Sequence, residues 1–169
     1  MSIRRVVILG LFVAIAGVLH SVESWVPLLF LVPGIKLGLA NVVALITIAL
    51  YGWRDALLVS VLRVFLGTLL VGVLLGPSFV MSFSGAVVST LVMSASYYFG
   101  RRQFSLLGIS VIGAVAHNVT QISVAALVVA SSNVFWYLPY LILLAVPTGI
   151  ATGLTAVYFL TKLPQDVIL

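Results

Sequence analysis

Arg63 is a charged side chain within an otherwise apolar segment, and this position suggests a function. It follows Arg54 by nine residues, which places it roughly 13 Å further along a helix. An arginine near the middle of a bilayer costs at least ~2.5–3.5 kcal/mol, so it requires an internal partner or a water-filled cavity. Two roles are open to it: binding of a polar ligand, or a structural role in an ion pair with Glu23 or in hydrogen bonds to backbone carbonyls.

A second group of polar side chains, His117, Asn118 and Gln121, interrupts another apolar run. The four-residue spacing places His117 and Gln121 on one helix face, with Asn118 beside them. Such side chains form hydrogen bonds between neighbouring membrane helices or bind a ligand. Three of them within five residues are more than helix packing needs, which favours a ligand site.

A third group, His20, Glu23, Lys36 and Asn41, is expected at the outer mouth of the same site. Glu23 and Lys36 are alternatively solvated residues at the membrane interface, whereas Asn41 lies inside its helix and is expected to line a cavity. Lys36 and Arg63 contribute two positive charges and Glu23 one negative charge, so the cavity is expected to be cationic. We therefore expect an anionic or strongly polar ligand, with Glu23 orienting Lys36 or Arg63.

Catalytic chemistry finds little support in the sequence. Glu23, Asp55 and Asp166 are the only acids, and they are expected at different ends of the molecule. Clustered carboxylates for magnesium are therefore absent. The chain has no cysteine and no G-x-x-x-x-G-K-[ST] nucleotide-binding loop. We expect a protein that is not an enzyme and that uses no cofactor or metal.

The composition determines which solvent surrounds these polar groups. Of 169 residues, 63% are hydrophobic and 7% are charged, whereas soluble domains carry roughly 25% charged residues. Such a chain belongs in a lipid bilayer, which excludes soluble enzymes and nucleic-acid-binding domains. One span needs about 20 residues, so the length predicts a single all-α domain, residues 1–169, of about six transmembrane helices.

Charges and turn residues divide the chain into these six helices. The expected ranges are 4–21, 39–51, 56–75, 78–99, 106–130 and 139–162. Residues 22–38 are apolar but contain Pro27 and the Pro33-Gly34 turn signal, so they are expected to form an outer loop or a re-entrant segment.

The basic residues predict the orientation of this bundle. With six spans, nearly all of them lie on the side of the two termini, and Lys36 lies on the opposite side. Those on the terminal side are Arg4, Arg5, Arg54, Arg101, Arg102 and Lys162. The positive-inside rule then places both termini in the cytoplasm, with the chain in the cell membrane.

Two motifs resemble a known family. These are Pro33-Gly34-Ile35-Lys36-Leu37-Gly38-Leu39-Ala40-Asn41 and Gly113-Ala114-Val115-Ala116-His117-Asn118 followed by Gln121. With Glu23 and the Ser82–Ser89 region, they resemble the Gx transporter family, also called heptaprenyl diphosphate synthase component I, over nearly the whole chain. More distantly, that family is similar to the six-helix substrate-binding S components of energy-coupling-factor (ECF) transporters.

The resemblance implies a membrane protein that binds a metabolite or vitamin from outside. A T component and two ATPase subunits would move it across the bilayer, and the loop after the first helix would cover the ligand. S components dock the T component through small residues of the first helix, which match Gly10 and Ala14 here. The alternatives are an accessory membrane subunit of isoprenoid synthesis, a protein that binds a prenyl diphosphate or lipid, and a stand-alone facilitator.

Overall fold

The computed structural model describes residues 2–25, 38–100 and 103–163, and every regular element in these ranges is a helix. The six α-helices are α1 (Ile3–Trp25), α2 (Asn41–Tyr51), α3 (Trp53–Val71), α4 (Pro77–Gly100), α5 (Leu106–Val129) and α6 (Leu138–Lys162). A 3₁₀ helix, η1 (Ser132–Tyr137), precedes α6. The predicted all-α class is confirmed.

Three helix ends differ from the expected ones by three residues or more. α3 begins at Trp53 instead of Ala56, because Gly52 alone makes the turn after α2. α1 continues past Ser21 through Glu23, because the sequence contains no helix breaker before Pro27. α3 stops at Val71 instead of reaching Leu75, because Gly72 caps its C-terminus. The predicted loop or re-entrant segment therefore begins later than expected, and residues 26–37, which contain most of it, lie outside the described residues.

Four helical segments are long and apolar enough to cross a membrane, which makes the chain a multi-pass membrane protein. They are Ile3–Ser24, Pro77–Gly100, Leu106–Val129 and Ser132–Lys162. α2 is different, since its 11 residues extend about 16 Å, half of a ~30 Å hydrocarbon core. The structure does not test whether all six helices cross the membrane, and this arrangement stays a prediction.

α2 lies at the centre of the bundle. It contacts each of the other five α-helices, and residues 41–48 are all buried. The sequence is consistent with this position, because α2 is apolar on nearly every side and its 11 residues are too few to cross the bilayer. Around it, the most extensive helix pairs are α5 with α6, α4 with α5, and α1 with α3.

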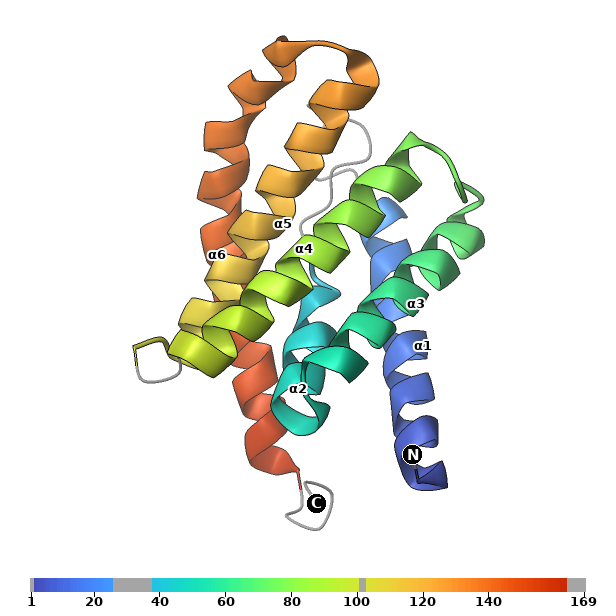
Figure 1. The fold of residues 1–169 in the computed structure, drawn as a ribbon, viewed down its shortest axis with the longest axis vertical. Helices are drawn as coiled ribbons and strands as arrows, with labels where there is room; N and C mark the ends of the chain where they lie inside the picture. The colour runs from blue at the N-terminus through green and yellow to red at the C-terminus, as the bar shows by residue number, and fades with distance from the viewer. Residues whose placement is uncertain (1, 26–37, 101–102, 164–169) are drawn as a thin grey trace.

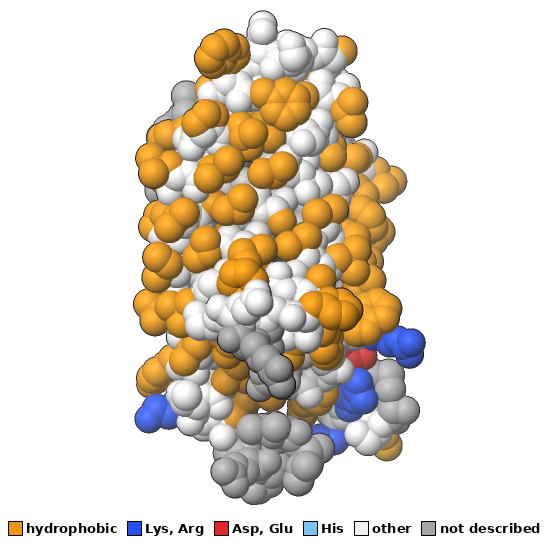
Figure 2. All heavy atoms as spheres, turned by 60° about the vertical axis from the view of Figure 1, so that its left-hand side comes forward, with side chains coloured by type: hydrophobic (Ala, Val, Ile, Leu, Met, Phe, Trp, Pro, Cys, Tyr) orange, Lys and Arg blue, Asp and Glu red, His pale blue; other side chains and the backbone are white. Residues whose placement is uncertain are grey.

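The two termini lie at one end of the molecule, and the α3–α4 and α5–α6 connections lie at the other (Figure 1). Hydrophobic side chains cover most of the face shown in Figure 2, whereas its Lys and Arg side chains gather at the end with the termini. The exposed Arg4, Arg54 and Lys162 are at the start of α1, the start of α3 and the end of α6. One end of the bundle is therefore basic.

A glycine turn places Asn41 and Arg63 at the same depth. Gly52 has a φ of 91°, which an L side chain rarely adopts, and its N–H ends α2 by donating to the carbonyls of Thr47 and Ile48. α3 begins at the next residue. Asn41 and Arg63 are each eleven residues from Gly52, so they meet about 16 Å from this turn.

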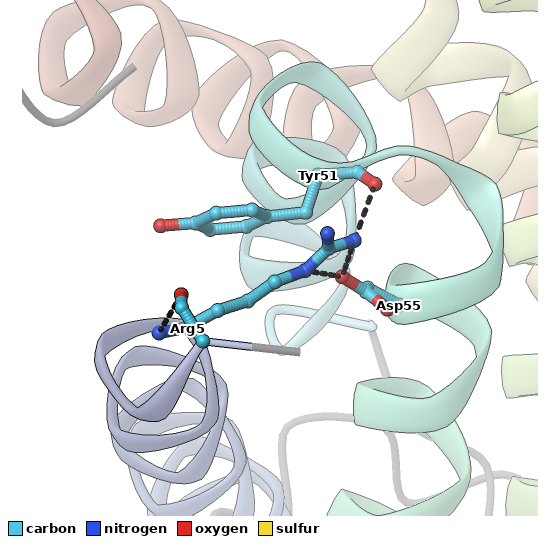
Figure 3. Close-up of polar contacts among 4 residues, drawn as sticks. Arg5, Tyr51 and Asp55 are labelled. Atoms are coloured by element: carbon cyan, nitrogen blue, oxygen red, sulfur yellow. Dashed lines mark hydrogen bonds and ion pairs between the residues drawn. The ribbon is translucent and has the colours of Figure 1, made fainter. Parts of the chain in front are cut away.

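Arg5 connects the start of α1 to this same turn (Figure 3). Its Nε donates to Asp55 Oδ2 at 2.8 Å, and its Nη2 bonds the same oxygen and the Tyr51 carbonyl. The guanidinium also lies over the Tyr51 ring, 5.5 Å from the centroid. Asp55 is buried in the first turn of α3, where the helix dipole favours an acid.

Asp55→Asn is expected to lower the free energy of unfolding by about 1 kcal/mol, because the Arg5 side chain is 39% exposed and solvent screens the pair. Arg5→Gln should cost a similar amount, and the double variant little more, since both remove the same interaction. Thermal or denaturant unfolding in detergent measures these changes, with Arg4→Gln as the control. Fully additive losses from the two changes would argue against the pair.

Candidate functional site

A cluster of buried polar side chains lies inside the bundle where α2 begins. Arg63 of α3 is 1% exposed, and its Nη2 donates to Asn41 Oδ1 at 2.7 Å. The Ser89 hydroxyl of α4 lies 3.5 Å from the same Asn41 oxygen and 3.2 Å from the Ala86 carbonyl of its own helix, so its one proton is shared between the two acceptors. Arg63 has therefore found an internal partner, as its depth requires.

His117 and Gln121 of α5 reach this cluster because glycines leave room for their side chains at two positions. A Cβ at Gly85 of α4 would lie 3.0 Å from atoms of both side chains, so α4 and α5 touch there. A Cβ at Gly38 would lie 2.8 Å from Asn41 Nδ2 and 3.4 Å from His117 Cδ2. We define the polar cluster as Asn41, Arg63, Ser89, His117 and Gln121.

Glu23 borders the polar cluster from the end of α1. Its Oε1 accepts a hydrogen bond of 3.0 Å from the backbone N–H of Leu39, in the turn that leads into α2. The Glu23 carboxylate is also close enough to Arg63 to attract it electrostatically. An acid at the start of a helix stabilises the helix dipole, so Glu23 orders the start of α2 as well.

Several hydrogen-bonding atoms around the cluster are buried without a partner among the described residues. They include Asn41 Nδ2, Arg63 Nε and Ser82 Oγ. The amide and guanidinium nitrogens are donors only, and the hydroxyl can donate. Burying such groups unpaired is costly, so they are suited to a ligand that supplies hydrogen-bond acceptors. The N-terminal end of α2 adds partial positive charge at this point.

The structure brings some of the predicted site residues together and directs others elsewhere. It brings Asn41, Arg63, His117 and Gln121 together, with Glu23 at their border. Asn118 is directed to the neighbouring helix instead, where its Nδ2 donates to the Leu141 carbonyl of α6 at 2.9 Å. Whether these residues bind a ligand stays a prediction, and Lys36 lies outside the described residues.

The other predicted residues lie outside the polar cluster, either buried between helices or exposed on the surface. His20 is buried against α3, where its ring packs on Gly67 and leaves no room for a Cβ. Gly10 and Ala14, predicted to dock a partner, are exposed on the outer face of α1.

Ser82, Gly85 and Ser89 share the face of α4 that meets the polar cluster, although they were not among the site residues predicted from the sequence. The signal was present, since these residues recur at three- and four-residue spacing and so share one face of α4. What the spacing could not provide was the helix that this face meets. Among the described residues, no group of three or more His, Cys, Asp or Glu side chains is suited to hold a metal ion.

Fold and site together define a multi-pass helical membrane protein with a buried polar centre. The family model described as heptaprenyl diphosphate synthase component I matches residues 12–159, and the chain belongs to this family. No curated protein matches the chain, and no solved structure matches it. The resemblance predicted from the two sequence motifs is thus confirmed.

Proposed function

We propose that this protein is the membrane-embedded substrate-binding and translocating component of a transporter, similar to an ECF S component. The observation that carries this proposal is Arg63, a buried arginine in hydrogen-bond contact with Asn41 at the centre of an apolar bundle. Charged groups at this depth mark ligand or ion pathways in many membrane proteins. Its neighbours come from four helices, which is typical of a binding site within a bundle.

The ligand is a small polar or anionic metabolite or vitamin. Among the described residues, Asn41 Nδ2, Arg63 Nε and Ser82 Oγ are buried without a partner, and a carboxylate or several carbonyl oxygens would accept hydrogen bonds from them. We assign ligand binding to Asn41, Arg63, His117 and Gln121, with Glu23 orienting Arg63. Lys36 belongs to the same predicted set, whereas we assign Asn118, which was also predicted to bind the ligand, to the contact between α5 and α6.

Transport would use a T component and two ATPase subunits, and both termini would face the cytoplasm of the cell. The outer face of α1 supports such a partner. A Cβ at Gly10 would have no atom within 4 Å, and Ala14 on the same face is exposed. Gly17, by contrast, is closed by Leu66 of α3, whose Cδ2 would lie 2.7 Å from a Cβ there.

A second candidate function follows from the family's description, which names a component of a prenyl diphosphate synthase. In that case the chain would be a non-catalytic membrane subunit, or would bind a prenyl diphosphate or another lipid. Arg63 would then serve to bind a diphosphate, and a soluble synthase would take the place of the ATPase subunits.

Native mass spectrometry of the protein, released gently from its own membrane, distinguishes these functions. We expect a retained polar metabolite, and T-component and ATPase subunits in the same preparation. A retained prenyl diphosphate, or a soluble prenyl synthase in place of the ATPases, would favour the second candidate.

Two neighbouring amides of α5 provide a matched pair for this measurement. Gln121→Leu is expected to lose the bound metabolite, because Gln121 belongs to the polar cluster. Asn118→Leu should retain it and lower only stability, because its amide bonds α6. Equal retention by the two variants would place the ligand elsewhere.

A further inference from the structure

An apolar groove lies on the outer surface of the bundle, apart from the polar cluster. It is formed between the start of α3 and the last turns of α4 and has a volume of about 510 Å³. The lining residues are Trp53, Leu91, Ser94, Ala95, Tyr98 and Phe99. Three of these six are aromatic, and the Ser94 hydroxyl is engaged with the Thr90 carbonyl of its own helix. The groove therefore offers an apolar surface.

The groove is at the basic end of the molecule, since α3 begins and α4 ends on the side of the two termini (Figure 1). Trp53, Tyr98 and Phe99 are exposed there, Phe99 by 93%. Aromatic side chains of this kind concentrate where the hydrocarbon core meets the lipid headgroups. The groove thus lies where a lipid places its headgroup and the first part of its acyl chain.

A cation lies at the rim of this groove. The Arg54 guanidinium carbon is 5.4 Å from the centroid of the Trp53 ring, so the charge rests on a lining residue and remains exposed. The nearest acid in the sequence, Asp55, is paired with Arg5. Among the described lining residues there is no acid, and the rim therefore has a positive charge next to an apolar channel.

We propose that this groove binds one anionic phospholipid of the bilayer, with an acyl chain along Leu91 to Phe99 and the phosphate on Arg54. Among the described residues, the charge that rests on the lining of the groove is that of one exposed arginine, and this matches the single charge of a phosphodiester. A prenyl diphosphate carries more charge and is usually held by clustered cations or by carboxylates with magnesium. The described residues contain no such acidic cluster.

Quenching of Trp53 fluorescence by brominated lipids tests this site. Trp25 and Trp136 are replaced by phenylalanine, so that Trp53 is the only tryptophan. The protein is placed in bilayers with brominated phosphatidylglycerol or brominated phosphatidylcholine of the same acyl chains. We expect the site to prefer phosphatidylglycerol over phosphatidylcholine roughly fivefold, because one basic residue near an anionic headgroup contributes about 1 kcal/mol.

Arg54→Gln and Lys162→Gln are the matched variants. Lys162 also lies over an exposed ring, that of Tyr158, at the same end of the molecule but outside the groove. Arg54→Gln is expected to abolish the preference, and Lys162→Gln to preserve it. Ala95→Leu should fill the groove and reduce quenching by both lipids.

Three results would overturn the proposal: equal quenching by the two lipids, equal effects of Arg54→Gln and Lys162→Gln, or unchanged quenching in Ala95→Leu. Unbrominated phosphatidylglycerol and farnesyl diphosphate are also compared as competitors. Stronger displacement by farnesyl diphosphate would reject the phospholipid in favour of an isoprenoid diphosphate. None of these measurements depends on the transported metabolite.

Discussion

Arg63→Lys is expected to reduce retention of the transported metabolite at least tenfold while leaving the protein folded. Lysine keeps the positive charge near Glu23 but loses the planar fork, in which Nη2 bonds Asn41 and Nε is available to a ligand. Loss of one charge-assisted hydrogen bond costs about 1.5–3 kcal/mol, which corresponds to at least a factor of ten in affinity.

Arg63→Met should have the larger effect on stability. It leaves the buried Asn41 oxygen with only the long contact from Ser89 and removes the charge that attracts Glu23. We expect a loss of about 1–3 kcal/mol in the free energy of unfolding, beside the loss of ligand. The lysine variant separates binding from folding, because its charge is conserved.

Native mass spectrometry measures retention, and thermal unfolding in detergent measures stability. Arg54→Lys is the control, since Arg54 lies on the same helix but is exposed at its start. If Arg63→Lys retains the metabolite as well as Arg54→Lys does, Arg63 is a structural residue and the binding site must be sought elsewhere.

The sequence predicted which polar residues converge better than it predicted how the helices are arranged around them. Arg63, Asn41 and His117 were expected to converge because each is costly in a bilayer, and the structure brings them together. The equal spacing of Asn41 and Arg63 from Gly52 was also present in the sequence, but it has meaning only once α2 and α3 form a hairpin.

Other features depend on helix packing, which no periodicity specifies. α2 was expected as one of six spans, and its length could be read from the sequence, but its place at the centre of the described bundle could not. Asn118 was expected beside the face of His117 and Gln121 as part of the ligand site, but the rotation of about 100° per residue directs it to α6. The Arg5–Asp55 pair joins residues 50 positions apart, so it required the packing of α1 on α3.

Gly149→Ala is expected to destabilise the bundle by about 3 kcal/mol, the upper part of the range for overpacked cores. A Cβ at this position of α6 would lie 2.6 Å from Val111 Cα and 3.1 Å from Val111 N of α5. These are backbone atoms, so a side-chain rotation cannot relieve the contact, and the two helices must separate. Gly153, one turn further, is similarly close to the Leu107 backbone.

Separation of α5 from α6 would also disturb the site. The Asn118–Leu141 bond and the buried hydrogen bond of 2.8 Å between Ser110 and Thr152 both join these helices. Since α5 carries His117 and Gln121, we expect Gly149→Ala to weaken metabolite retention as well as stability. Unfolding temperature and retention should therefore fall together in this variant.

Gly10→Ala is the matched control, because its new methyl group has no atom within 4 Å. Alanine is a better helix former than glycine by up to ~1 kcal/mol, so this variant should be as stable as the parent or more stable. The same chemical change is thus expected to act in opposite directions at two positions, according to whether another backbone lies against the glycine. Equal unfolding temperatures for the two variants would contradict the close contact between α5 and α6 at Gly149.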